Sequence, residues 1–110
     1  METIGTIEVV IFSLKQGVND VEGKKALETL SECVQGYPGF IGRKLGKNEA
    51  GRWMDLVYWT DHQSALSAAE QVMQNPDALK VFELIDEETM IMYHFDIESE
   101  FTPELILNQS

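Results

Sequence analysis

Basic side chains are scarce in this sequence. It has 8 Lys and Arg against 19 Asp and Glu, which gives a formal net charge of −11. A chain this acidic is repelled by the phosphate backbone of nucleic acids and by anionic membrane surfaces, and no stripe of Lys and Arg offsets the repulsion. The charge therefore argues against nucleic acid as a partner, and its simplest effect is solubility.

Cysteine and long apolar segments are also nearly absent. Cys33 is the only cysteine, so no intrachain disulfide can form, which is typical of a reducing cytoplasm. No uninterrupted apolar run approaches the roughly 20 residues that a membrane-spanning helix needs. Residues 1–3 lack the basic region that opens a secretory signal. We therefore expect a cytoplasmic protein that makes no membrane contact.

The composition suits one folded domain. Hydrophobic residues make up 44% of the 110 residues, which is enough for a core in a chain of this length. Alternation of apolar side chains with a period of two predicts four strands, at residues 6–15, 40–47, 52–59 and 89–97.

Two segments have helical spacing instead. Asn19 is placed to cap the first helix, which we expect to end before Gly36. A capping pattern at residues 60–63 opens the second helix, and the Asn75-Pro76 pair breaks it and starts a shorter one. The predicted apolar stripe of the second helix is Leu66, Ala69, Val72 and Met73.

The β-α-β-β-α-β order predicts an α+β, ferredoxin-like sandwich in which helices cover one face of an antiparallel sheet. We expect this domain at residues 1–97, followed by a tail at residues 98–110 that docks either on its own domain or on a partner subunit. The first strand carries apolar side chains on both of its faces. The helices of one chain can cover only one face of such a sheet. The other face then needs a partner, and a second copy of the chain is the simplest one, so we expect a homodimer.

His94 is the most informative titratable residue. It is expected on the same strand face as Met90 and Met92, where it can be partly buried. Such a histidine is either a general base toward a phenol or enol, or a packed side chain whose ring is satisfied by its neighbours.

Asp55 is expected on a covered face beside Trp53 and Val57. There the carboxylate is either a base whose pKa burial raises, or the partner of Arg43 or Lys44 in a structural salt bridge.

Four large aromatic residues also have two interpretations. Together they line a pocket for an aromatic ligand, or they form the core: Trp59, Trp53, Phe12 and Phe82. His94 and Asp96 place two metal-ligand types on one strand face, but no third ligand follows at a motif spacing, so we expect no metal site.

Three segments carry a resemblance to a known family. They are residues 10–17, the Tyr37-Pro38-Gly39-Phe40 turn, and Tyr58-Trp59-Thr60-Asp61 before an alanine-rich helix. Together they resemble the antibiotic biosynthesis monooxygenase domain, a dimeric α/β-barrel family, and the related stress-responsive α/β-barrel proteins look similar over the same span, residues 6–97.

The resemblance implies a homodimer whose sheets pack into a barrel, with a pocket in each subunit between helices and sheet. Some members oxidise polycyclic aromatic substrates with O₂ and without metal or flavin, and others degrade haem. Of the monooxygenase members' asparagine, tryptophan and tyrosine, only Trp59 and Tyr58 find a match here. Haem-degrading members have an asparagine where this chain has Val10, and a helix histidine where residues 63–88 have none.

Two functions from different classes follow. The first is a cofactor-independent monooxygenase-like protein that binds a small apolar or aromatic molecule. Its catalytic candidates are His94 and Asp55, and its ligand-binding candidates are Trp59, Tyr58, Trp53, Phe12 and Phe82. The second is a non-catalytic ligand-binding or structural dimer module of the same superfamily. Neither is expected to use a cofactor.

Overall fold

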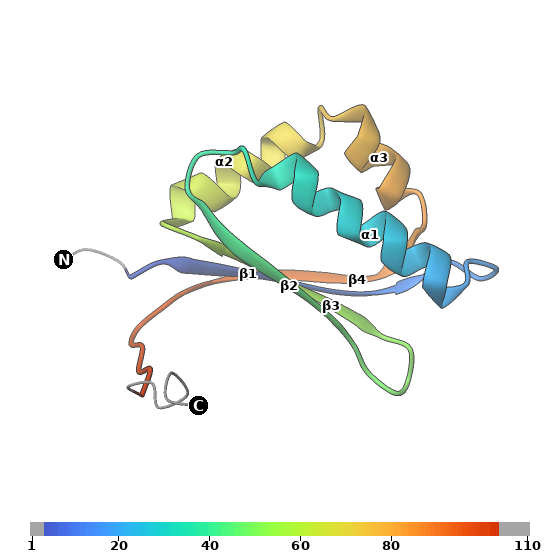
Figure 1. Ribbon diagram of the computed structural model, residues 1–110, viewed down its shortest axis with the longest axis horizontal. Coiled ribbons are helices and arrows are strands. Elements are labelled where there is room, and N and C mark those ends of the chain that lie inside the picture. The colour runs from blue at the N-terminus through green and yellow to red at the C-terminus, as the bar shows by residue number, and fades with distance from the viewer. Residues whose placement is uncertain (1–3, 104–110) are drawn as a thin grey trace, which may run out of the picture.

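The computed structural model describes residues 4–103, which form one sheet and three helices. Figure 1 shows the three helices on one side of the sheet and none on the other. In chain order the elements are β1 (Thr6–Leu14), α1 (Asp20–Val34), β2 (Phe40–Lys47), β3 (Trp53–Trp59), α2 (His62–Val72), α3 (Pro76–Phe82) and β4 (Ile85–Asp96).

The sheet has the strand order β2-β3-β1-β4, and its neighbouring strands are antiparallel. This confirms the ferredoxin-like fold. Val10 pairs with Asp55 on one side and with Met92 on the other, so all three side chains lie on the same face. That face is the one that the helices cover, because Asp55 and its alternate neighbours on β3 are buried.

Side-chain caps fix where each helix begins. The Asn19 Oδ1 accepts the N–H of Glu22 at 2.8 Å, and the Asp61 Oδ1 accepts the N–H of Ser64 at 2.7 Å. Asn75 caps α3, whose first residue is Pro76. The helix starts were therefore readable from short polar residues, although the cap of α2 is Asp61 rather than the Thr60 of the capping pattern.

Gly39 explains the Pro-Gly-Phe turn in physical terms. Its φ is +86°, in the left-handed region that favours glycine. A Cβ there would lie 2.5 Å from the Cβ of Ser64 and 2.8 Å from the Oγ1 of Thr60. Its carbonyl also accepts the N–H of Thr60 at 2.8 Å. The turn therefore packs directly against the start of α2, and no larger residue fits.

Two expectations need correction. β4 begins at Ile85, four residues earlier than predicted, because Leu14 pairs with Ile85 and Ser13 with Asp86 beyond a register shift. The predicted apolar stripe of α2 was wrong in part: Val72 packs against the core as expected, but Leu66 and Met73 are exposed, and the buried residues of the helix are Ala65 and Ala68. Helix α2 approaches the sheet closely enough that small side chains fill its contact face.

The face of the sheet opposite the helices is largely apolar and uncovered. We call it the outer face, and by register it contains Ile7, Val9, Ile11, Met54, Leu56, Tyr58, Ile91, Tyr93 and Phe95. Tyr93 and Phe95 are 49% and 54% exposed, and Ile91 and Met54 are 42% and 40% exposed. The Tyr93 and Phe95 rings are 5.7 Å apart. An apolar surface of this extent is typical of an interaction site.

Candidate functional site

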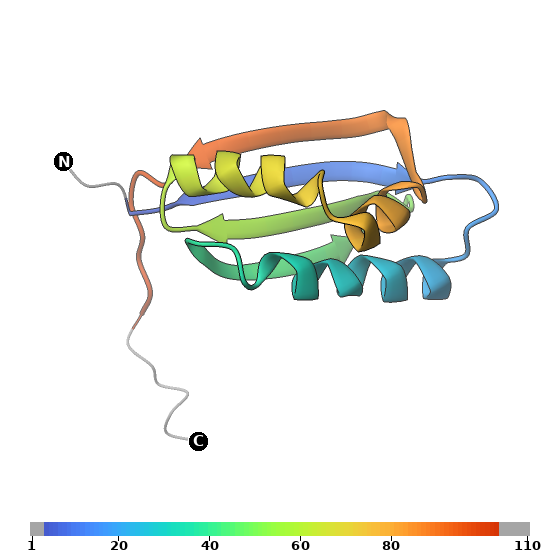
Figure 2. The ribbon, with the colours of Figure 1, turned by 90° about the horizontal axis from the view of Figure 1, so that it is seen from above.

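The helices leave part of their own side of the sheet open. Seen from above in Figure 2, most of β4 lies beyond the helices, at the edge of the sheet. Met90 and Met92 are 42% and 46% exposed there, although they lie on the helix-facing side. His94 continues the same row and is half-buried. An apolar strip that ends in a titratable residue is therefore accessible on this side.

His94 lies beside a glutamate that the sequence analysis did not single out. Glu8 pairs with His94 across β1 and β4, and the Nε2 of His94 is 3.3 Å from the Oε2 of Glu8. The two side chains are 16% and 12% exposed, so water reaches both poorly. The contact is close, but its geometry is not that of a formed hydrogen bond.

Trp59 adds a third polar group to this pair. It lies on β3 and is 1% exposed, and its Nε1 is buried without a hydrogen-bond partner among the described residues. The indole N–H nevertheless lies near enough to the Glu8 carboxyl to lower its pKa. Buried N–H groups without a partner are uncommon in folded proteins, so the indole N–H of Trp59 is a donor that the described residues leave free.

Burial has the largest effect on Glu8, and it raises the pKa of this carboxyl above the ordinary value of 4.5. The charge of His94 opposes the rise and that of Asp55 adds to it. The net direction is upward, so Glu8 holds its proton more tightly than an exposed glutamate. A carboxyl whose pKa is raised, placed beside an imidazole, is suited to proton transfer.

The start of α2 borders the same cluster. The rings of His62 and His94 meet edge to face, with their centroids 5.6 Å apart. The Nδ1 of His62 is 3.6 Å from the Oδ1 of Asp96, which also accepts a hydrogen bond from the Thr6 hydroxyl at 2.8 Å. His62 is solvated, since its side chain is 50% exposed. The cluster thus runs from a buried centre at Glu8 to a solvated rim at His62.

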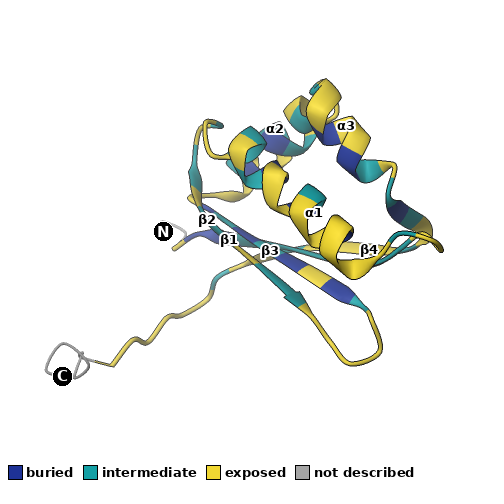
Figure 3. Cartoon of the chain, turned by 45° about the vertical axis from the view of Figure 1, so that its right-hand side comes forward, coloured by how far each residue is buried: buried dark blue, intermediate teal, exposed yellow. Residues whose placement is uncertain are grey.

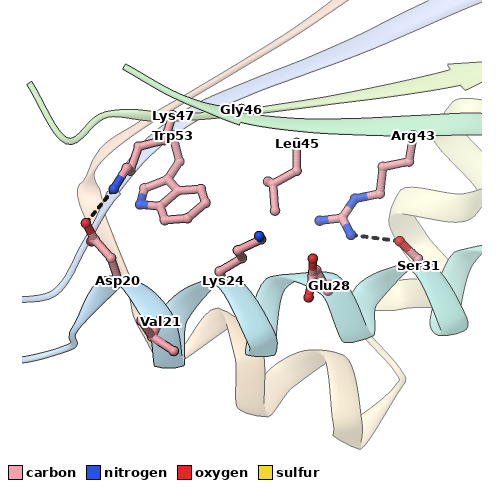
Figure 4. Close-up of a pocket in the computed structure, with 10 residues that line it drawn as sticks. All are labelled: Asp20, Val21, Lys24, Glu28, Ser31, Arg43, Leu45, Gly46, Lys47 and Trp53. Carbon is pink, nitrogen blue, oxygen red and sulfur yellow. Dashed lines mark hydrogen bonds and ion pairs between the residues drawn. The ribbon is translucent and has the colours of Figure 1, made fainter. Parts of the chain in front are cut away.

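Asp55 has a different environment. Arg43 donates to both of its carboxylate oxygens, from Nε at 2.8 Å and from Nη2 at 2.7 Å. Arg43 also donates to the Leu27 carbonyl at 2.7 Å and to the Ser31 hydroxyl at 3.0 Å, the second of which is drawn in Figure 4. This is the salt bridge that the sequence analysis gave as the structural alternative, with Arg43 as the partner and not Lys44. A catalytic role for Asp55 stays an untested prediction.

The structure does not bring the predicted aromatic residues together. Phe12 and Trp53 lie in a core cluster under α1 and α3, with Phe82 packed against it, whereas Trp59 belongs to a second cluster under α2. Tyr58 is on the outer face, because it pairs with Ile7. Of the predicted ligand-binding set, Trp59 is the residue whose polar group lies near Glu8.

A separate cavity of about 500 Å³ lies between α1 and the β2–β3 hairpin (Figure 4). Trp53 and Leu45 line it from the sheet, and Lys24 lines it from the helix. Lys47 forms an ion pair with Asp20 at one end and lies 5.6 Å from the centre of the Trp53 ring. The volume is within the range of ligand pockets. Neither Glu8 nor His94 lines this cavity, so it is a second and independent place for a small molecule.

Metal ligands do not gather anywhere in residues 4–103: no group of three or more His, Cys, Asp or Glu side chains could hold an ion. In the same part of the chain, none of the helices is both long and apolar enough to cross a membrane.

Glu8 could have been found from the sequence by a simple signal. It is the one charged residue within the apolar alternation of the first strand, on the same face as Val10 and Phe12. A charge at the centre of a covered strand needs a partner. The partner, His94, is 86 residues away, and only the β1–β4 register brings the two together.

The fold and this arrangement of strands are those of the antibiotic biosynthesis monooxygenase proteins. The chain resembles a mutant form of SnoaB, a cofactor-independent oxygenase from Streptomyces nogalater, with a TM-score of 0.73 at 18% identity, over 91% of this chain and 99% of that one. A putative antibiotic biosynthesis monooxygenase from Nitrosomonas europaea gives a TM-score of 0.68 at 12% identity, over 89% and 94% of the two chains. A dimeric ferredoxin-like protein from an uncultured marine organism gives 0.66 at 15% identity, over 94% and 95%.

By sequence, neither a family model nor a curated protein matches the chain. At these identities the structural likeness defines the fold and leaves the ligand and the reaction to be argued from the side chains.

Proposed function

We propose that the protein binds a small apolar or aromatic molecule on the open, helix-facing side of β4, and that it acts there as a cofactor-independent monooxygenase-like enzyme. The observation that carries the proposal is the buried Glu8–His94 pair, which adjoins the exposed side chains of Met90 and Met92. Binding sites of this kind combine an apolar surface with a few placed polar groups.

The 3.3 Å contact with Glu8 favours a proton on the Nε2 of His94. When Nε2 carries the proton and faces the Glu8 carboxylate, the lone pair of the imidazole is on Nδ1. Nδ1 then removes a proton from the bound molecule, and Glu8 stabilises the imidazolium that results. The carbanion left on the substrate forms a C–O bond to O₂, which is the oxidant, and the peroxide takes up the proton and loses water to leave a carbonyl group, so no bound cofactor is required. The nearby indole N–H of Trp59 lowers the pKa of Glu8 and so favours its carboxylate form.

A non-catalytic ligand-binding or structural dimer module is the second candidate. Trp59 and Phe12 are each 1% exposed and lie in core clusters, and the Asp55 carboxylate is fully engaged by Arg43. Trp59 and Phe12 belong to the predicted ligand-binding set, and Asp55 is one of the two predicted catalytic residues. Their burial favours a core at those positions and restricts any chemistry to the Glu8–His94 region.

A thermal-shift screen of quinones, hydroxylated aromatics and haem tests for binding, because a ligand that prefers the native state raises the melting temperature. Oxygen consumption with each hit then separates the two candidates. The enzyme is supported if His94→Gln and Trp59→Phe abolish oxygen uptake while Trp53→Phe, which alters the other cavity, does not. Binding without oxygen uptake would leave the ligand-binding module.

The outer face supports a second part of the proposal, that two copies of the chain pair through it. Nine apolar side chains occupy it, and the helices cover only the opposite face (Figure 1). An isologous dimer buries the same patch from each subunit, so one apolar surface is sufficient. The fold neighbour described as dimeric is consistent with this. The single cysteine supports a cytoplasmic location for this homodimer.

A further inference from the structure

The chain leaves the domain after β4 as an exposed arm. The last contact with the sheet is the N–H of Ile97, which donates to the carbonyl of Gly5 at 2.8 Å. Residues 98–103 follow, and we call them the C-terminal arm. All six are exposed and lie in no helix or strand, as the yellow stretch that leads to the C-terminus in Figure 3 shows.

The arm carries a large apolar side chain that its own domain does not cover. Phe101 is 88% exposed, the highest value among the large hydrophobic side chains of residues 4–103. Within the described residues, no hydrogen bond or ion pair joins the arm to the rest of the chain. A phenylalanine on a free segment is unfavourable in water, and its burial is one of the larger apolar gains that a single residue can give.

The direction of the arm is the second observation. In Figure 1 it descends from the end of β4 to the side of the sheet opposite the helices. This is the side of the outer face, where Tyr93 and Phe95 are exposed. The arm therefore leads toward the place that a second copy occupies when two outer faces pair.

The length of the arm and the charge of its side chains are also consistent with docking on a second copy. Two stacked sheets lie about 10 Å apart, and six extended residues span about 20 Å. The arm is therefore long enough to cross from one sheet to the other. It carries Glu98 and Glu100, and the outer face contains the exposed basic side chain of Lys44, which pairs with Leu56. The arm carboxylates and Lys44 have opposite charges.

We propose that the C-terminal arm of each subunit docks on the other subunit, with Phe101 packed against the outer face of the partner and the arm carboxylates toward Lys44 of the partner subunit. This inference rests on the proposed pairing of outer faces. By two-fold symmetry each dimer has two such contacts. The arm contact stabilises the dimer, and it shields the edge of the apolar outer face from water.

Sedimentation of Phe101→Ala and Phe101→Asp over a range of concentrations tests the arm, with Ser99→Ala as a control on the same segment. The dimer dissociation constant rises about 100-fold or more for Phe101→Ala, because two rings lose their burial in each dimer. It rises further for Phe101→Asp and changes less than about two-fold for Ser99→Ala. Dilute samples, in which every variant is monomeric, show the same melting temperature as the wild type.

Three results overturn the proposal, and they are distinguishable. If the Phe101 variants dimerise like the wild type while Tyr93→Asp is monomeric, the outer faces pair without the arm. If Phe101→Ala lowers the melting temperature of the monomer, the ring packs on its own domain. If the wild type never dimerises, the pairing of outer faces itself fails, and the arm contact fails with it.

Discussion

Replacement of Asp55 by asparagine tests whether this residue holds the fold or serves the chemistry. The substitution keeps the shape of the side chain and removes its charge. Arg43, whose side chain is 6% exposed, then keeps its contacts to Leu27 and Ser31 but faces no anion. Removal of one partner from a buried ion pair costs about 3–5 kcal/mol. For a domain of this size, that lowers Tm by roughly 15–30 °C.

Urea unfolding followed by tryptophan fluorescence measures this loss, since Trp53 and Trp59 are both buried. The double variant Arg43→Met with Asp55→Leu is the control, because it removes both charges and restores most of the stability. The reasoning is wrong if Asp55→Asn loses less than about 1 kcal/mol. In that case the ion pair is not structural, and the predicted catalytic role of Asp55 becomes the better explanation of its burial.

Three further substitutions have defined outcomes. Gly39→Ala lowers the unfolding free energy by at least about 2 kcal/mol, because the φ of Gly39 is positive and a Cβ there would meet Ser64. Gly36→Ala is the control, since a Cβ at Gly36 has no neighbour within 4 Å. Urea titration compares the two variants, and equal stability would contradict the strain at Gly39. Glu8→Gln stabilises the protein relative to wild type more at pH 8 than at pH 4. A carboxyl whose native pKa is raised contributes its full stability below pH 4.5, its unfolded pKa, and that contribution is lost as the pH rises through the native pKa. The glutamine stays neutral throughout. A pH-independent difference would show that Glu8 is not desolvated. Tyr93→Asp on the outer face yields a folded monomer by sedimentation, and a dimer that persists in this variant would exclude that face as the interface.

The fold was predictable because local patterns agree with it. Alternation identified the four strands of the sheet, and Asn19 and Asn75 fixed helix starts as expected. The start of β4 was not predictable, since it depends on a register shift against Ser13 on a distant strand. The stripe of α2 failed for a related reason. Hydrophobicity favoured Leu66 and Met73, but the buried residues of the helix are Ala65 and Ala68, and those two larger residues are 40% and 56% exposed.

The candidate site was only partly predictable. His94 and Trp59 were singled out for their residue types, and the salt bridge of Asp55 with Arg43 was among the alternatives. Glu8 was missed, because its importance comes from burial and from a partner on another strand, neither of which a local pattern contains. Sequence patterns thus identified the groups capable of chemistry, and the β1–β4 register selected among them.

The two tryptophans provide the most direct test of where a ligand binds. Trp59 adjoins the Glu8–His94 pair, and Trp53 lines the cavity between α1 and the hairpin, so their indole N–H signals report on the two places separately. In a ¹H–¹⁵N NMR titration with a hydroxylated aromatic from the thermal-shift screen, we expect the signals of Trp59 and His94 to move with ligand concentration while that of Trp53 stays fixed. Movement of Trp53 alone would place the ligand in the other cavity and contradict the proposed site.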